Sequence, residues 1–457
     1  MGAKKDFKVK LIKTEVVAAM LPMQEHWLSQ SNLDLLLPPV DVGVFLCYQN
    51  PITSGILPKI WSFDSMVNIL KVSLGETLVS YYAFAGELVQ NLAGEPEILC
   101  NNAGVNFIEA WADVELKEIN FYNPDESIEA KLVPKKKHGV LAVQVTELKC
   151  GGVVVGCTFD HRVADAYSFN MFLVSWAELA LSKPLSQLPS FQRSFLSPRC
   201  PASFYDPVID TMYLPISVLK QETTNIDHDQ VISRIYYVKA EEIRRLQSLA
   251  NCNNTKFTKL ETFSAFLWKT IASDTNKNFR LGIVVNGRSR LSDGDEEQAK
   301  ILKGYFGNVL SIPFGEKRVE ELKEKSLSWV AHAVHEFLER AVNKEHFLGL
   351  INWVENHRPE PALARIYATD EDTPALVVSS GQQFPVRKIE FGWGEAVFGS
   401  YHFPWEGKSG YVMPMLSPKG NGDWIVYMHM LKGQIHLVEA IASNVFNPLT
   451  ADYLNLK

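Results

Sequence analysis

The sequence predicts an α/β fold built as two similar halves. Short runs rich in β-branched and aromatic residues, each bounded by turn residues, alternate with longer stretches whose apolar residues recur at helical spacing. The order of the two kinds is mixed and several helical stretches are long, which favours an α/β or α+β fold over a sandwich. A length of 457 residues suggests two or three domains.

The individual elements follow from these patterns. Seven runs are expected to be strands because they are short and β-branched or aromatic. They are residues 42–48, 140–148, 151–159, 231–238, 280–287, 375–380 and 423–430. Five stretches are expected to be helices because apolar residues return every three or four positions. They are residues 65–86, 168–181, 240–251, 259–273 and 319–343.

One segment interrupts this alternation and marks a boundary between two domains. Residues 182–210 are rich in proline and serine, lack periodicity and are far longer than a typical connection of about 4–6 residues. We therefore expect an N-terminal domain over 1–181, a crossover loop over 182–210 and a C-terminal domain over 211–457. Ligand sites favour the seam between two domains.

Composition excludes several classes of protein. Lys and Arg number 45 against 52 Asp and Glu, a net charge of −7, whereas a nucleic-acid-binding face needs clustered basic residues. No window approaches the ~18 consecutive apolar residues that a membrane span needs. The cysteines form no C-x-x-C pair, so we expect reduced thiols in a cytoplasmic protein and no disulfide framework or zinc site. They are Cys47, Cys100, Cys150, Cys157, Cys200 and Cys252.

Ionisable residues gather at the end of one expected strand. The apolar run 151–159 is followed within six positions by Asp160, His161, Arg162 and Asp165. Packing rarely requires such a group, and a junction between a strand and a helix exposes side chains at the carboxyl edge of a sheet. His161 is therefore the first candidate for chemistry.

Three interpretations of His161 stay open from the residues alone. It could be a structural histidine beside a helix that Asp160 or Asp165 caps. It could bind a metal together with Asp165, four positions on, but no third ligand is evident. A neutral imidazole could also act as a general base on a substrate hydroxyl. The chain has no G-x-S-x-G nucleophile motif, and a base without a covalent partner suits direct transfer between two bound substrates.

Two motifs and their context resemble the plant BAHD acyltransferase family. "HRVAD" at 161–165 matches the family's H-x-x-x-D motif, and "EFGWGEAVFG" at 390–399 resembles its D-F-G-W-G signature. Four further segments follow the family's order, "SNLDLLLP" (31–38), "SYYAFAGEL" (80–88), "VNGRSRL" (285–291) and "KGYFGNVL" (303–310). The resemblance spans essentially the whole chain. It is strongest to the coniferyl alcohol acyltransferase group, with the shikonin and alkannin acyltransferases close behind.

The resemblance implies a fold, a reaction and two substrates. The fold would be two pseudo-symmetric domains of chloramphenicol-acetyltransferase-like topology, with mixed sheets flanked by helices and a channel at the interface. Acyl-CoA, as a co-substrate, and a small aromatic alcohol would enter from opposite mouths, with no metal and no permanently bound cofactor. His161 would deprotonate the alcohol, which attacks the thioester carbonyl. The enzyme would be a monomer in the cytoplasm, without a nucleic-acid or membrane partner.

The same resemblance implies supporting residues. Asp165 would hold the histidine loop through an ion pair with Arg288, with Arg290 the weaker match. Thr258 would lie near the pantetheine arm of CoA, a role compatible with capping the helix that follows it. Asn308 would lie near the channel, where its amide could donate to the oxyanion or fix a loop turn.

The second motif departs from the family's pattern. Glu390 stands in place of Asp, and its charge is expected to keep a local ion pair. Glu395 and Ala396 replace a basic residue and a proline, which puts an anion contact by this loop in doubt. The rest of the motif is expected to shape the channel and the domain packing away from the chemistry: Gly392, Trp393 and Gly394.

The expected acceptor pocket includes Ser379 and Gly381 in "VSSGQQFP". Relatives that acylate shikimate or quinate carry tryptophan at the position of Gly381. The glycine is therefore expected to widen that wall and to favour an aromatic, largely apolar acceptor. The lysines at 135–137 are expected to lie in a solvated loop rather than to bind CoA phosphates.

The function expected from the resemblance is transfer of an acetyl or short branched acyl group from CoA to a hydroxyl of an aromatic metabolite. Coniferyl alcohol and a hydroxynaphthoquinone are the candidate acceptors. One alternative is acylation of an amine, but a cationic amine would need pocket carboxylates, for which no clear set is evident. The other is a non-catalytic relative that binds a metabolite or a partner protein, and the intact His161 and Asp165 disfavour it.

Overall fold

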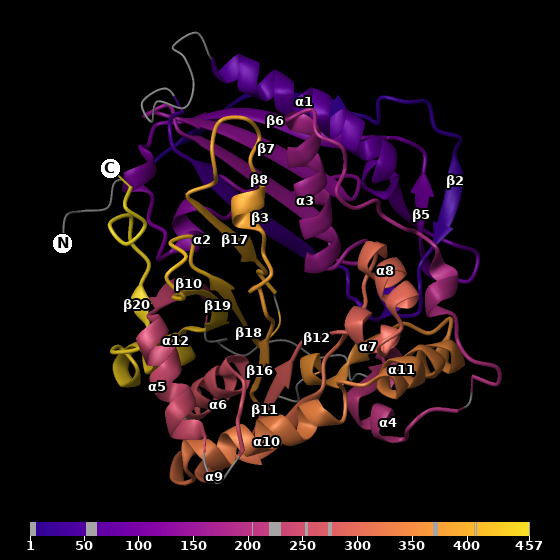
Figure 1. Cartoon of the computed structure of the whole chain (residues 1–457), viewed down its shortest axis with the longest axis vertical. Helices are drawn as coiled ribbons and strands as arrows, with labels where there is room; N and C mark the ends of the chain where they lie inside the picture. The colour runs from indigo at the N-terminus through magenta and orange to yellow at the C-terminus, as the bar shows by residue number, and fades with distance from the viewer. Residues whose placement is uncertain are drawn as a thin grey trace.

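A computed structural model describes residues 6–51, 62–202, 204–218, 230–251, 255–272, 277–368, 373–405, 407 and 409–456. Cys252 lies outside the described residues. Two large sheets, one above the other in Figure 1, are each flanked by helices. This arrangement confirms the predicted α/β class.

The helices are α1 (Phe63–Ser80), α2 (Pro124–Ser127), α3 (Ala166–Ala180), α4 (Val208–Met212), α5 (Ala240–Ala250), α6 (Lys259–Ile271), α7 (Arg288–Ser292), α8 (Glu296–Gly304), α9 (Val319–Glu324), α10 (Leu327–Glu339), α11 (Lys344–His357) and α12 (Lys432–Ile441). The strands are β1 (Val9–Val17), β2 (His26–Ser29), β3 (Asp41–Tyr48), β4 (Glu87–Gln90), β5 (Pro96–Cys100), β6 (Val105–Ala112), β7 (Leu141–Leu148), β8 (Val153–Asp160), β9 (Tyr213–Pro215), β10 (Val231–Val238), β11 (Asn278–Ile283), β12 (Val285–Asn286), β13 (Leu310–Ser311), β14 (Phe314–Arg318), β15 (Ala362–Ala364), β16 (Ala375–Val378), β17 (Phe398–His402), β18 (Gly410–Leu416), β19 (Trp424–Leu431) and β20 (Asn447–Pro448).

The first sheet has the strand order β1-β6-β7-β8-β3-β17. Every residue of β8 is buried, in keeping with its unbroken apolar sequence and its place between β7 and β3. Helices α1 and α3 pack on each other over this sheet, and the indole of Trp176 donates to the carbonyl of Leu70 at 3.1 Å. Strand β8, which ends at Asp160, thus lies between β7 and β3 in a sheet that α1 and α3 cover.

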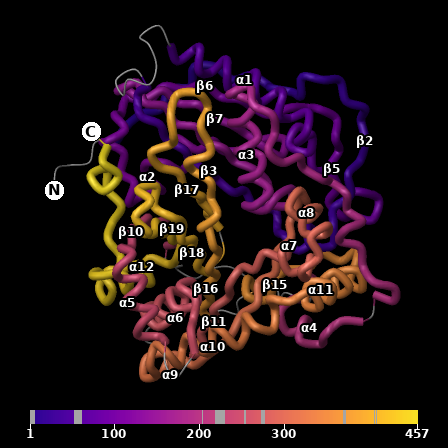
Figure 2. The backbone as a smooth tube through the Cα atoms, viewed as in Figure 1, coloured from indigo at the N-terminus to yellow at the C-terminus, as the bar shows by residue number. Residues whose placement is uncertain are grey.

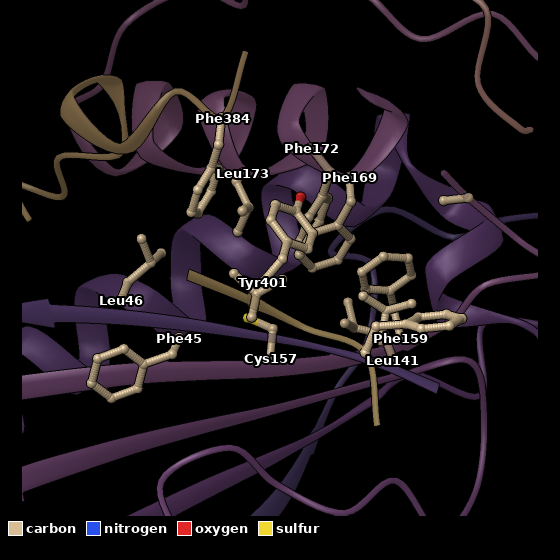
Figure 3. Close-up of a cluster of buried hydrophobic side chains, with 14 of the residues drawn as sticks. Phe45, Leu46, Leu141, Cys157, Phe159, Phe169, Phe172, Leu173, Phe384 and Tyr401 are labelled. Atoms are coloured by element: carbon tan, nitrogen blue, oxygen red, sulfur yellow. The ribbon is translucent and has the colours of Figure 1, made fainter. Parts of the chain in front are cut away.

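Aromatic side chains fill the space between α3 and this sheet (Figure 3). Phe169 on α3 stacks on Phe159 of β8, with ring centroids 4.1 Å apart, and Tyr401 reaches the same cluster from β17. On β8, a Cβ at Gly156 would lie 2.1 Å from the carbonyl oxygen of Leu132. Only glycine lets that neighbouring backbone approach the strand so closely.

Strand β17 comes from the second half of the chain but belongs to the first sheet. It pairs antiparallel with β3, from Phe398 opposite Cys47 to His402 opposite Gly43. Figure 2 shows this late segment beside β3. The predicted domain ranges 1–181 and 211–457 stay a prediction about the division of the chain, because the sheets themselves exchange a strand across it.

The second sheet has the order β14-β11-β16-β18-β19-β10-β20 and mixes parallel with antiparallel pairs. Helices α5, α6, α10 and α12 pack together beside it and share one apolar core, which includes Trp268 and Phe446. A two-stranded sheet of β12 and β13 lies at the inner end of β11. These two short strands lead directly into the functional region.

Two predicted elements are divided in the structure. The expected helix 319–343 breaks after α9, because Ser326 caps a new helix by accepting a hydrogen bond from the backbone of Trp329 at 3.2 Å. The expected strand 280–287 separates into β11 and β12 at Val284. The α1 region also ends earlier than expected, at Ser80.

Candidate active site

The histidine turn lies where the sequence predicts it, between β8 and α3. The backbone N–H of His161 donates to the carbonyl of Val40 at 2.9 Å, which ties the turn to the residue just before strand β3. Asp165 is the N-cap of α3 and accepts a hydrogen bond from the backbone of Ser168 at 2.9 Å. Contacts of residues in and next to this turn therefore fix the junction between β8 and α3 that carries the imidazole of His161.

His161 opens onto a cavity of about 710 Å³ lined by both halves of the chain. One face of this cavity is formed by four ring side chains that we call the aromatic wall: Phe403, Trp405, Tyr411 and Tyr367. The ring of Phe403 meets His161 edge to face, with centroids 6.0 Å apart and an interplanar angle of 89°. A cavity of this size with mostly apolar walls and few polar groups is typical of a site for a small molecule.

The two ring nitrogens of His161 differ in their surroundings. Nδ1 is buried and has no hydrogen-bond partner, and the ring lines the cavity, so we infer that Nε2 is the nitrogen available to a ligand. Burial lowers the pKa of the imidazole below its ordinary value of 6.5, and the carboxylates of Asp165 and Asp160 offset only part of that effect. The ring is therefore neutral near pH 7 and able to accept a proton.

Asp165 and Arg288 form a buried ion pair across the two halves. Arg288 donates from Nη1 to Oδ2 at 2.7 Å and from Nη2 to Oδ1 at 3.2 Å, and the two side chains are only 1% and 5% exposed. Other guanidinium hydrogens go to Ser168 Oγ and the carbonyl of Gly307. Arg290, the weaker candidate, is exposed. The carboxylate thus caps a helix and binds a cation simultaneously.

Asn308 contacts the histidine turn, but not in the expected catalytic way. Its amide nitrogen donates to the carbonyl of His161 at 2.9 Å and to Oδ1 of Asp34 at 3.0 Å. Because both amide hydrogens are used, the expectation that Asn308 donates to an oxyanion is wrong. The alternative that it fixes the turn agrees with these contacts.

The turn is also anchored by charged contacts that the sequence analysis did not predict. Asp160 receives two hydrogen bonds from the guanidinium of Arg162, at 2.9 and 2.8 Å, and a third from its backbone N–H at 3.0 Å. Lys136, only 13% exposed, lies 3.2 Å from Asp41 and 3.8 Å from Asp160. The expectation of a solvated loop at 135–137 is therefore wrong for Lys136, which pairs with carboxylates beside the histidine.

Thr258 lies at the first turn of α6 and not in the wall of this cavity. It accepts a hydrogen bond from the backbone of Glu261 at 3.2 Å, and Glu261 accepts one from the backbone of Thr258 at 2.6 Å. This reciprocal capping box accounts for the threonine structurally. A contact with CoA stays a prediction.

The second motif folds around its own acidic residue. Glu390 Oε1 accepts hydrogen bonds from the backbones of Gly392, at 2.6 Å, and Gly394, at 3.0 Å, both with φ above +100°. No cation pairs with Glu390 in the part of the chain that the structure describes, and the expected ion pair stays a prediction. Trp393 is buried and packs edge to face on Tyr48, with centroids 6.1 Å apart. The motif does not line the cavity and supports packing; the expectation that it shapes the channel stays a prediction.

Ser379 and Gly381 line the cavity, but the glycine leaves no open space behind it. A Cβ at Gly381 would lie 2.5 Å from Met415 and 3.0 Å from Met413. Two methionines therefore occupy the volume into which a larger side chain would extend. The expectation that Gly381 widens this wall is therefore wrong. Methionine side chains fill the space, and they make the wall apolar and adaptable.

Within the described residues, no group of three His, Cys, Asp or Glu side chains could hold a metal ion. In the same ranges, no helix is long and apolar enough to cross a membrane. A second cavity, of about 360 Å³, lies beyond Leu37 and Pro38, which line both cavities, and Arg162 faces it. The histidine turn is thus flanked by two hollows.

The chain is similar to known transferases over most of its length. A family model described as "Transferase family" matches residues 7–444. The chain is 27% identical over 442 residues to a shikimate O-hydroxycinnamoyltransferase of Nicotiana tabacum, covering 92% of this chain and 96% of that protein. It is also 27% identical over 442 residues to anthranilate N-benzoyltransferase protein 3 of Dianthus caryophyllus, covering 91% and 94%.

Among solved structures, F. graminearum TRI101 complexed with coenzyme A and T-2 mycotoxin is similar in fold. Its TM-score is 0.73 at 12% sequence identity, over 92% of this chain and 99% of that one. This likeness confirms the predicted two-domain, chloramphenicol-acetyltransferase-like fold with sheets flanked by helices.

The ion pair generates a prediction about stability. Asp165→Ala and Arg288→Ala should each lower the free energy of unfolding by about 3–5 kcal/mol, because each leaves a buried charge without its partner. Arg290→Ala, which removes an exposed arginine two positions away, should change it by less than about 0.5 kcal/mol. Thermal unfolding of the three variants tests this. Unchanged melting of Asp165→Ala would show that the pair has no structural role.

Proposed function

Because the chain belongs to the Transferase family, which confirms the resemblance to the BAHD acyltransferases, we propose that it is an acyl-CoA-dependent O-acyltransferase. The proposed donor is acetyl-CoA or a short branched acyl-CoA. The proposed acceptor is the hydroxyl of an aromatic specialised metabolite such as coniferyl alcohol or a hydroxynaphthoquinone. The observation that carries this proposal is the imidazole of His161, which lines an aromatic-walled cavity and whose pKa is lowered by burial.

The proposed reaction uses the Nε2 nitrogen of His161. The alcohol oxygen binds beside Nε2 and gives up its proton as it attacks the carbonyl carbon of the thioester. A tetrahedral intermediate forms, and its collapse breaks the carbon–sulfur bond and expels the CoA thiolate. The imidazolium then returns its proton to the thiolate, so the base is regenerated. Neither a covalent acyl-enzyme nor a metal is needed for this balance.

Acyl-CoA as the donor is supported by two findings. The chain's relatives include acyltransferases, and TRI101, which shares the fold, was solved with coenzyme A bound. The cavity of about 710 Å³ also exceeds what a small aromatic alcohol alone requires. The remaining volume suits the acyl group and the end of the pantetheine arm.

An aromatic acceptor is supported by the cavity wall. Phe403 stacks against Trp405, with a 9° angle between the rings, and lies 4.5 Å from Tyr411 between centroids. Planar rings gain about 0.5–1.5 kcal/mol from such contacts beyond their burial. Gln382 adds a buried amide nitrogen without a protein partner, which can donate to a phenol, methoxyl or carbonyl oxygen.

Acylation of an uncharged aromatic amine is the second candidate. It is favoured by the similarity to an anthranilate N-benzoyltransferase. A cationic amine is disfavoured, because among the described residues that line the cavity Asp165 is the one carboxylate, and its charge is already bound by Arg288. The same proton acceptor would serve either an arylamine or an alcohol.

A thiol-release assay tests the proposed function. Purified protein with acetyl-CoA and coniferyl alcohol should release free CoA, and shikimate or quinate should support much slower release. His161→Ala should lose about 10²–10⁴-fold in kcat, the usual contribution of a positioned general base. His332→Ala removes an exposed histidine on α10 and should leave the rate unchanged.

Wild-type-like turnover by His161→Ala would exclude the general base. Absence of thiol release from the wild-type protein, across acetyl-CoA and several aromatic alcohols and amines, would instead favour the non-catalytic alternative.

The lowered pKa of His161 predicts the acidic limb of the pH profile. The base works only when neutral, so kcat/KM should stay level above pH 6.5 and fall as the pH drops through a folded-state pKa below that value. Initial rates for the acceptor between about pH 5 and pH 8, with melting curves at each pH, measure the midpoint. A midpoint above 6.5 in fully folded protein would contradict the buried, neutral imidazole.

A further inference from the structure

A buried chain of polar side chains runs behind the aromatic wall and takes no part in the proposed chemistry. Its members come from both sheets and from the segment after α2. In order of contact they are Ser400, His402, Glu129, Tyr427, Ser233 and His429. All are buried except Glu129, whose side chain is 17% exposed. Burying polar groups in such a place costs free energy unless they are hydrogen-bonded.

Two contacts of this hydrogen-bonded chain hold the segment 402–405, which carries Phe403 and Trp405 of the aromatic wall. Near one end, Nδ1 of His402, the residue before Phe403, lies 3.0 Å from Oε1 of Glu129. At the other end, His429 Nε2 lies 3.0 Å from the backbone carbonyl of Trp405. Phe403 and Trp405 are therefore held in place from both sides by hydrogen bonds that do not involve their own rings.

The direction of the hydrogen bonds follows from the groups involved. The carbonyl of Trp405 can only accept, so Nε2 of His429 carries a hydrogen, and Nδ1 of the same ring lies 2.9 Å from Ser233 Oγ. Glu129 Oε1 accepts from Tyr427 as well as from His402. Burial alone would raise the pKa of Glu129, but the His402 hydrogen bond, with the nearby His402 and His429 rings, brings it below its ordinary value. The Trp405 carbonyl and the Glu129 carboxylate thus each accept from identified donors, and hydrogen bonds of this kind in a buried network rigidify a site.

We propose that this hydrogen-bonded chain is a positioning device for the aromatic wall, and that it makes the site selective for a planar aromatic ligand. The proposal rests on the proposed function, because the wall is assigned there to the acceptor. His402, Glu129 and His429 are positioning residues, since none of them lines the cavity. If the wall were free to tilt, flexible aliphatic ligands would bind as well as flat ones.

Paired variants of His429 test the proposal. His429→Leu removes the donor to the Trp405 carbonyl, whereas His429→Gln keeps an amide donor on a side chain of similar reach. The readout is the ratio of kcat/KM for coniferyl alcohol to that for 1-hexanol, with acetyl-CoA as donor. His429→Leu should lower this ratio at least tenfold with the KM for acetyl-CoA unchanged, and His429→Gln should restore it to within about threefold.

A matched control separates positioning from a general loss of stability. His357 also hydrogen bonds a tryptophan carbonyl, with Nδ1 2.7 Å from Trp353 O, but lies on α11 away from the wall. His357→Leu should lower the melting temperature and leave the acceptor ratio unchanged. A His429→Leu protein that melts lower but keeps the wild-type ratio would overturn the proposal.

Two provisions keep the test decisive. If His429→Leu does not fold, Ser233→Ala removes the partner of Nδ1 at smaller cost and should shift the ratio in the same direction. If the wild-type protein releases no thiol, the proposed function fails, and thermal stabilisation by coniferyl alcohol against 1-hexanol then replaces the kinetic ratio. Equal loss of stabilisation by both ligands in His429→Leu would overturn the positioning role independently.

Discussion

The ion pair between Asp165 and Arg288 is the contact on which the geometry of the site depends. One carboxylate caps the helix that follows the histidine turn, binds a guanidinium from the other half and accepts a hydrogen bond from the backbone of Val309 at 3.1 Å. These three contacts fix the turn relative to α3, to α7 and to the segment after α8. The imidazole therefore has one position relative to both cavity walls. Such a pair costs desolvation energy, which its complete set of hydrogen bonds offsets.

The exchange of β17 makes the seam between the halves rigid in a second way. Because β17 pairs with β3, and β3 pairs with β8, the strand before the aromatic wall and the strand before His161 belong to one sheet. Backbone hydrogen bonds thus set the relation between Phe403 and the histidine ring. Side-chain contacts from the second sheet, through His429, then complete the placement. The cavity is bounded by a framework rather than by mobile loops alone.

Elements and site were predictable from the sequence to different extents, for physical reasons. The strand, turn and helix around His161 depend on local patterns, such as the apolar run before Asp160 and the cap at Asp165, and these were correct. The predictions failed where a polar side chain contacts a residue that is distant from it in the sequence. Asn308 gives its amide to Asp34, which is 274 residues away, and Lys136 pairs with Asp41. Side-chain volume behind Gly381 likewise depends on methionines of β18, which no motif reveals.

No carboxylate is bonded to the imidazole of His161, and this arrangement has a chemical consequence. In a triad, a carboxylate bonded to the imidazole stabilises the imidazolium and strengthens the base. Here the nearest candidate, Asp165, is neutralised by Arg288, and Nδ1 of His161 has no partner at all. Burial lowers the pKa of the imidazole, and in the proposed reaction a weak base suffices, because the alcohol's proton leaves only as the carbon–oxygen bond forms. Catalysis of this kind depends on holding the hydroxyl against Nε2 and the thioester at the same time, which makes the rigidity of the wall as important as the histidine.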